Sequence, residues 1–201
     1  MLVVFLTSRL IQDRPKRVAT LTLANQLTLG RLLLVPAIVI LVIYGHSGWA
    51  LITFIVAGIT DSLDGLIARW SGQRTELGAL LDPMADKLLL VSTFVVLTVP
   101  GLGLANQLPV WLTVLIISRD VIIVVTVAVV NFAIERFTFK PSLFGKLATL
   151  VYVLTGATTL FFNYLHQKSA FVDVAVYASL IVTIGSGLHY ILHAARALNQ
   201  D

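Results

Sequence analysis

Six long apolar stretches restrict this 201-residue chain to a small set of folds. They cover approximately the ranges 26–45, 49–71, 77–99, 109–133, 143–165 and 170–194. A helix needs about 20 mostly apolar residues to cross the hydrocarbon core of a bilayer, and each stretch reaches that length. The runs are too long and too apolar for the strands of a transmembrane β-barrel. We therefore expect an all-α integral membrane protein whose six transmembrane helices form a bundle.

The composition excludes an ordinary soluble domain. Hydrophobic residues make up 58% of the chain and charged residues only 12%, and the mean hydropathy is +0.94. The sequence contains no cysteine, so disulfides and thiolate chemistry are excluded. In a membrane protein, the net charge of +4 is best explained by anionic lipid headgroups and not by nucleic acid.

Basic residues gather in alternate connections between the apolar stretches. The connections 45–48 and 100–109 carry no lysine or arginine, and 166–169 carries only Lys168. The other connections and the two flanks hold Arg14, Lys16, Arg17, Arg74, Arg136, Lys140 and Arg196. By the positive-inside rule, both termini are then cytoplasmic. The bacterial inner membrane is the location that we expect.

The first 24 residues differ in character from the rest of the chain. Their short apolar patch precedes a basic cluster, which is the reverse of the order in a signal peptide. We therefore expect a cytoplasmic or interfacial extension at 1–24, the six-helix domain at 25–196 and a short cytoplasmic tail at 197–201.

Four aspartates lie within or beside these apolar stretches, where a charge is costly. Asp61 and Asp64 belong to the second stretch, and Asp82 and Asp86 to the third. A charge near the bilayer centre costs roughly 2.5–3.5 kcal/mol on insertion scales, so such residues are functional candidates. Four close carboxylates would also repel one another unless a cation joined them. The sequence therefore predicts a metal site near a membrane surface.

The helical spacing places these carboxylates on two stripes. Positions 61, 64, 65, 68 and 69 share one face of the second helix, and positions 78, 82 and 86 share one face of the third. Asp61 lies about 12 Å deeper than Arg69 at 1.5 Å per residue. Since the two helices run in opposite directions, we expect the stripes to face each other across a polar cavity that opens to the cytoplasm.

Oxygen ligands of this kind suit Mg²⁺, Mn²⁺ or Ca²⁺. Two such ions would neutralise four carboxylates and would suit phosphoryl chemistry. The small residues Gly65, Ala68 and Gly78 leave room for a ligand, and Arg69 can hold a phosphate. A divalent-cation transporter is the alternative from another class, because transporters also carry intramembrane carboxylates. A cation path, however, has no need of Arg69 or of the small residues.

The combined pattern D-x2-D-G-x2-A-R-x8-G-x3-D-x3-D resembles the signature of the CDP-alcohol phosphatidyltransferase family at every position. The resemblance implies transfer of the phosphatidyl group of CDP-diacylglycerol to an alcohol with release of CMP, two divalent ions (Mg²⁺ or Mn²⁺), and a homodimer. It implies that Asp86 is the general base. The implied metal ligands are Asp61, Asp64, Asp82 and Asp86. The implied CDP-lipid-binding residues are Asn25, Thr28, Gly65, Ala68, Arg69 and Gly78.

The acceptor alcohol depends on other polar residues. Asn25, Thr28 and Arg31 resemble the family's N-x2-T-x2-R segment, although Asn25 could simply cap its helix. Arg119, Lys140 and Lys146 could form a cationic pocket for a phosphorylated acceptor. Alternatively, Arg119 could simply neutralise Asp120, and the two lysines could be ordinary cytoplasmic anchors. The acceptor-binding candidates are Arg31, Arg119, Lys140 and Lys146.

These segments resemble most the branch of the family that makes phosphatidylglycerophosphate from glycerol 3-phosphate. They also resemble the branch that makes cardiolipin with phosphatidylglycerol as the acceptor. The pair Arg119-Asp120 follows the cardiolipin-type pattern, since the glycerophosphate branch usually has glutamate after the arginine. Glycerol 3-phosphate is our first prediction and phosphatidylglycerol is the alternative.

Overall fold

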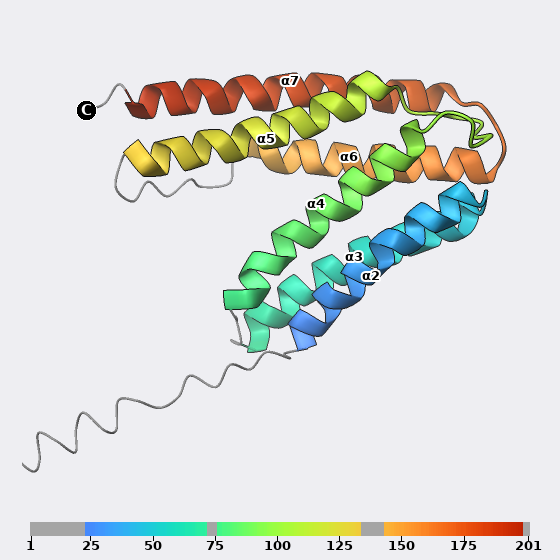
Figure 1. The fold of residues 1–201 in the computed structure, drawn as a ribbon, viewed down its shortest axis with the longest axis horizontal. Coiled ribbons are helices and arrows are strands. Elements are labelled where there is room, and N and C mark those ends of the chain that lie inside the picture. The colour runs from blue at the N-terminus through green and yellow to red at the C-terminus, as the bar shows by residue number, and fades with distance from the viewer. Residues whose placement is uncertain (1–22, 72–75, 134–142, 199–201) are drawn as a thin grey trace, which may run out of the picture.

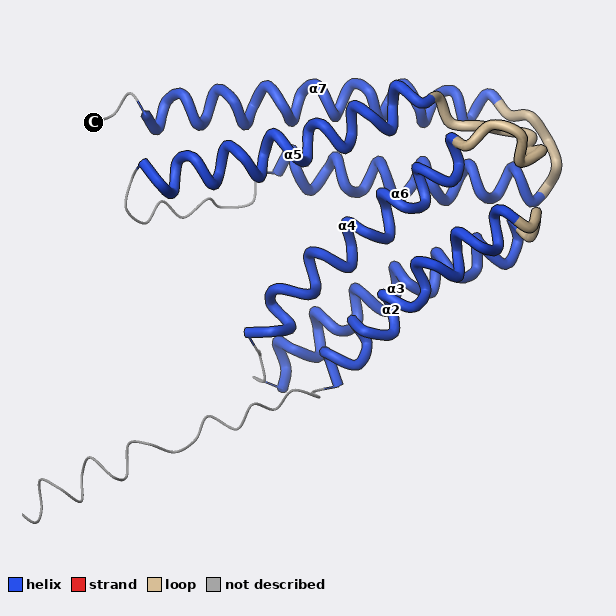
Figure 2. Tube along the Cα trace, in the orientation of Figure 1, coloured by secondary structure: helices blue, strands red, loops and turns tan. Residues whose placement is uncertain are grey.

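The computed structural model describes residues 23–71, 76–133 and 143–198, with side chains described for 26–61, 84–126 and 144–190. The regular elements of the described residues are all helices, joined by loops and turns, with no strand among them (Figure 2). The helices are α2 (Leu23–Ile43), α3 (Ser47–Ser71), α4 (Glu76–Thr98), α5 (Val110–Ala133), α6 (Leu143–Tyr164) and α7 (Ala170–Leu198). For the described part of the chain, the prediction of an all-α protein with six helices is confirmed. α7 continues to Leu198, beyond the end predicted near 194.

The helices form two groups that are joined at one end (Figure 1). α5, α6 and α7 run side by side, while α2, α3 and α4 form a second group at an angle to them. Within the second group, α2 packs extensively against both α3 and α4, whereas the described parts of α3 and α4 have few contacts with each other. Contacts of α3 with α6, and of α4 with α5, connect the two groups. α2 is therefore the element that holds the two aspartate-bearing helices together.

The outer surface is apolar and part of the interior is polar, which is the reverse of a soluble protein. On α7, Val174 and Ile181 are 66% and 70% exposed, whereas Ser179, Thr183 and Ser186 are buried. Among the described residues, three helical segments are long and apolar enough to cross a membrane: Gln26–Ile43, Phe144–Tyr164 and Ala170–Tyr190. Exposed apolar side chains of this kind need lipid around them, so the chain is a membrane protein.

Hydroxyl groups on the buried face of α7 pair with α6. The Ser179 and Thr155 hydroxyls lie 2.8 Å apart, and the Thr183 and Tyr152 hydroxyls lie 2.7 Å apart. Interhelical hydrogen bonds of this kind contribute about 0.6–2 kcal/mol each inside a membrane. Ser186 lies about one turn further along the same face of α7 and is also buried in the bundle.

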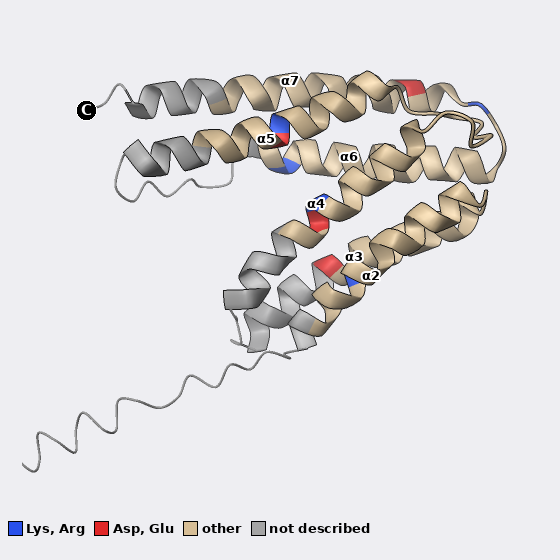
Figure 3. Ribbon diagram, in the orientation of Figure 1, with Lys and Arg blue, Asp and Glu red and all other residues tan. Residues whose placement is uncertain are grey.

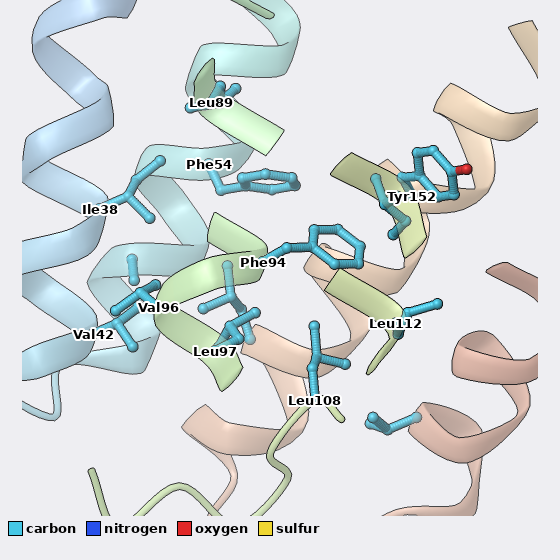
Figure 4. Packing of buried hydrophobic residues seen from close by; sticks show 14 of the residues in the cluster. Ile38, Val42, Phe54, Leu89, Phe94, Val96, Leu97, Leu108, Leu112 and Tyr152 are labelled. Carbon is cyan, nitrogen blue, oxygen red and sulfur yellow. The ribbon is translucent and has the colours of Figure 1, made fainter. Parts of the chain in front are cut away.

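An apolar core packs α4 against the group of α5, α6 and α7 (Figure 4). Phe94 of α4 is buried and meets Tyr152 of α6 edge to face, with ring centroids 6.1 Å apart. Phe54 of α3 and Leu112 of α5 belong to the same buried cluster. Because aromatic rings bury large areas in defined orientations, this contact restricts how α4 crosses α6.

A second set of contacts closes the bundle at the far end from the aspartates. Asn106, in the connection between α4 and α5, receives a hydrogen bond on its carbonyl from the Asn163 amide at 3.0 Å and donates its backbone N–H to that amide's oxygen at 2.7 Å. The Asn106 side chain donates to the Gln167 carbonyl at 2.6 Å and accepts from the Ser169 N–H at 2.9 Å. Asn163 is 2% exposed, so these groups have no access to solvent.

We predict that Asn163→Leu destabilises the protein, because the buried N–H and carbonyl of Asn106 lose their partner. Each unsatisfied buried group costs about 1–3 kcal/mol. Thermal unfolding in detergent checks this, with Gln167→Ala as the control, since that change keeps the backbone carbonyl that Asn106 uses. Equal melting temperatures for the two variants would contradict the prediction.

Candidate functional site

A buried arginine joins the two aspartate-bearing helices. Arg31 of α2 is 1% exposed, and its Nη1 lies 2.7 Å from the Asp61 Oδ1 of α3. The same Nη1 forms an ion pair with Asp86 of α4. The two carboxylates remain 41% and 39% exposed, so the cluster is buried on the arginine side and open on the acidic side.

The local sequence explains this placement. Thr28 precedes Arg31 by three residues and is also fully buried, so both lie on the face of α2 that packs into the bundle. A guanidinium can be buried there only because carboxylates neutralise it. Described charges in the cluster sum to −1, from one arginine and two aspartates. The described charges therefore suit a further cation.

The donor set fits a hard divalent ion, since both described acidic residues offer carboxylate oxygens. Among the side chains that the structure describes, no group of three or more His, Cys, Asp or Glu residues could hold a metal. The side chains of Asp64 and Asp82 lie outside that set. Asp61 and Asp86 thus supply two converging carboxylates of the predicted four.

A second cluster of charges lies on the other side of α4. The Arg119 Nη1 of α5 is 2.7 Å from the Asp120 Oδ1, and the Lys87 Nζ of α4 is 3.1 Å from the Asp120 Oδ2. The Arg119 Nε donates to the Ser186 hydroxyl of α7 at 3.1 Å. This network ties α4, α5 and α7 together at the level where the first cluster ties α2, α3 and α4.

Adjacent residues on α4 serve the two clusters. Asp86 and Lys87 point about 100° apart around the helix, because an α-helix has 3.6 residues per turn. Asp86 therefore reaches α2, while Lys87 reaches α5. Figure 3 shows the result as a band of acidic and basic positions that crosses α2, α3, α4, α5 and α6.

A cavity extends from the first cluster along α3 and α6. It has a volume of about 670 Å³ and is lined by Asp61, Lys146 and Thr149 together with apolar residues of α3 and α6. Lys146 is exposed. One cation of the predicted acceptor set therefore shares a cavity with one of the predicted metal ligands.

The structure places the other predicted residues only in part. Asn25 lies in α2, and the remaining residues lie in α3 or α4, but their side chains are outside the described set. These residues are Asp64, Gly65, Ala68, Arg69, Gly78 and Asp82. Lys140 lies outside the described residues altogether. The roles predicted for all of them stay predictions.

Lys87, which the structure places in the second cluster, was not among the residues predicted for the site. The available signal was a lysine inside a stretch otherwise long and apolar enough to span a membrane, directly after Asp86. What the sequence alone could not supply was the partner, because Asp120 is brought to Lys87 only by the crossing of α4 and α5.

Carboxylates and cationic side chains assembled within an apolar helical bundle define a membrane protein with a polar site for charged ligands. The family model for CDP-alcohol phosphatidyltransferases matches residues 21–185. The chain belongs to the CDP-alcohol phosphatidyltransferase family.

Individual relatives include both predicted branches. A probable phosphatidylglycerophosphate synthase of Mycobacterium tuberculosis is 39% identical over 184 residues, which cover 87% of this chain and 82% of that protein. The human cardiolipin synthase (CMP-forming) is 36% identical over 162 residues, covering 71% of this chain and 52% of that protein. The Streptomyces coelicolor cardiolipin synthase (CMP-forming) is 36% identical over 138 residues, covering 64% and 60%.

These matches confirm the predicted family and the predicted enzyme class. Nothing in them favours the divalent-cation transporter, the alternative that the intramembrane carboxylates left open.

We predict that Arg31→Met lowers the stability of the metal-free protein, because Asp61 and Asp86 lose the charge between them. Breaking a buried ion pair by removing one partner costs about 3–5 kcal/mol. Because the two carboxylates are partly exposed, we expect the loss of unfolding free energy to lie at or below the lower end of that range. Thermal unfolding with a chelator present measures the loss.

A double variant separates charge from packing. Arg31→Met with Asp61→Asn should be more stable than Arg31→Met alone, since one of the two repelling charges is gone. Equal or lower stability of the double variant would contradict the electrostatic explanation.

Proposed function

We propose that this protein transfers the phosphatidyl group of CDP-diacylglycerol to glycerol 3-phosphate, giving phosphatidylglycerophosphate and CMP. The observation that carries the proposal is the pair of charge clusters on the two sides of α4. One is acidic and suits a divalent metal, and the other is cationic and suits a phosphate. The name of the Mycobacterium tuberculosis relative supports the same acceptor.

In this proposal, Asp61, Asp64, Asp82 and Asp86 hold two divalent ions, Mg²⁺ or Mn²⁺. When bound, such ions neutralise the diphosphate and stabilise the charge on the leaving group. Asp86 takes the proton of the acceptor hydroxyl. The hydroxyl oxygen forms a bond to the phosphorus next to the lipid, and the bond from that phosphorus to the CMP oxygen breaks.

The donor and the acceptor use different residues. We assign the CDP portion of the lipid to Asn25, Thr28, Gly65, Ala68, Arg69 and Gly78. The small residues would let the nucleotide approach the helix backbones, and Arg69 would pair with a phosphate. We assign the acceptor to Arg31, Arg119, Lys140 and Lys146. The position of Lys146 in the same cavity as Asp61 supports a route between acceptor and metal ligands.

The same proposal includes the arrangement in the membrane. All six helices would cross the bilayer, with both termini and the polar cavity on the cytoplasmic side of a bacterial inner membrane. The alternating distribution of basic residues supports this orientation. The catalytic domain would be 25–196, preceded by the extension 1–24 and followed by the tail 197–201, and the enzyme would be a homodimer among membrane lipids.

A second candidate is cardiolipin synthesis, with phosphatidylglycerol as the acceptor. The specific observation in its favour is Asp120 after Arg119, the residue found in the cardiolipin-type pattern. The human and Streptomyces coelicolor relatives carry that name. Both acceptors bring a phosphate on a glycerol, so the cationic cluster fits either one.

The deciding experiment offers the two acceptors separately. Purified protein in detergent receives CDP-diacylglycerol, Mg²⁺ or Mn²⁺, and either glycerol 3-phosphate or phosphatidylglycerol, and both CMP and the lipid product are measured. We expect CMP and phosphatidylglycerophosphate with glycerol 3-phosphate, and no product from Asp86→Asn. Cardiolipin as the only product would select the second candidate. Absence of CMP with both acceptors would overturn the proposal.

A further inference from the structure

The second cluster carries an excess of positive charge. Lys87 and Arg119 contribute two cations and Asp120 one anion, so the three described ionic side chains sum to +1. An unbalanced charge within a helical membrane bundle is costly unless a ligand or water compensates it. The first cluster has the opposite sign, so a cation is expected on one side of α4 and an anion on the other.

We propose that Lys87 is a further acceptor-binding residue, which holds the acceptor's phosphate together with Arg119, and that Asp120 is the positioning residue for both cations. The inference rests on the proposed transfer to a phosphate-bearing acceptor. It adds a specificity-determining residue on the helix that carries the general base.

The hydrogen bonds of Arg119 leave one donor group for a ligand. Its Nε donates to Ser186 and its Nη1 to Asp120, which fixes the plane of the guanidinium. Its Nη2 is buried and has no hydrogen-bond partner among the residues that the structure describes. A buried donor without a partner is unfavourable, so a phosphate oxygen that reached this nitrogen would form a favourable charged hydrogen bond with it.

Lys87 is the most exposed residue of the same cluster. Its side chain is 50% exposed, against 19% for Asp120 and 11% for Arg119. An ammonium group has three donors, and the ion pair with the Asp120 Oδ2 uses one of them. Because the lysine stem is flexible and the guanidinium is held in place, Lys87 can close on a phosphate that Arg119 has oriented.

The position of Lys87 next to Asp86 connects phosphate binding with the reaction. The Cα atoms of adjacent residues are about 3.8 Å apart, and their side chains diverge by about 100° on a helix. A three-carbon acceptor lying against α4 can therefore place its phosphate at Lys87 and its hydroxyl at Asp86. An acceptor without a phosphate would have no partner for the cations.

If Lys87 had a purely structural role, its replacement would have different effects. The ion pair between Lys87 and Asp120 also joins α4 to α5, so its loss could act through helix packing alone. In that case, a variant would lower the melting temperature and disturb donor and acceptor kinetics together. Phosphate binding instead predicts a change confined to the acceptor.

The test compares Lys87→Met with Lys87→Arg, and uses Lys168→Met as the control because Lys168 is exposed in the loop between α6 and α7. CMP release is measured against glycerol 3-phosphate and CDP-diacylglycerol concentrations in turn. We expect Lys87→Met to raise the KM for glycerol 3-phosphate by about tenfold or more, which is the loss of one charged hydrogen bond. The KM for CDP-diacylglycerol should not change, Lys87→Arg should restore the acceptor KM, and Asp120→Asn should raise it.

A binding measurement makes the result independent of turnover. Glycerol 3-phosphate should raise the melting temperature of the wild type and of Lys168→Met, but not that of Lys87→Met. The same thermal shift measured with phosphatidylglycerol in micelles tests whether the cluster binds a phosphodiester. An unchanged acceptor KM with the thermal shift retained in Lys87→Met would overturn the inference. If the wild type released no CMP with any acceptor, the proposed function would fail, and the thermal shift alone would still decide whether Lys87 binds the phosphate.

Discussion

The ion pairs of Arg31 with Asp61 and Asp86 are the interaction on which the rest of the site depends. The described parts of α3 and α4 have few contacts with each other, and each helix packs on α2. The guanidinium of Arg31 in α2 brings a carboxylate from each of these two helices to one place. The few described contacts between α3 and α4 would not do this by themselves. Without a positive charge between them, the two carboxylates would repel each other in a medium that screens poorly.

α4 then separates two environments of opposite charge. Its Asp86 face belongs to the acidic cluster and its Lys87 face to the cationic one, and the buried contact of Phe94 with Tyr152 holds the helix between them. A reaction between an anionic acceptor and an anionic donor requires cations that bind both substrates. It also requires a general base that can still accept the proton of the acceptor hydroxyl. In the proposed function, these tasks are divided between two sides of one helix, and the proposed base Asp86 is next in the chain to the proposed phosphate-binding residue Lys87.

Much of the fold could be predicted from the sequence, because each helix coincides with an apolar stretch bounded by turn or charged residues. The two aspartate stripes also followed from helical spacing, and Asp61 and Asp86 do converge. Two features required the structure. Arg31, predicted as an acceptor residue, lies against the carboxylates, and Lys87 reaches Asp120 across the crossing of α4 and α5. Both depend on how helices cross, which periodicity within one helix does not determine.

The central claim, that the side of α4 facing α2 binds metal and the side facing α5 does not, can be measured directly. Free Mn²⁺ is followed by electron paramagnetic resonance while it is titrated into the wild type, Asp61→Asn and Lys87→Met in detergent. The account predicts that Asp61→Asn weakens Mn²⁺ binding by about tenfold or more, because a charged ligand is lost, while Lys87→Met binds as the wild type does. Unchanged binding in Asp61→Asn, or a loss of binding in Lys87→Met alone, would contradict it.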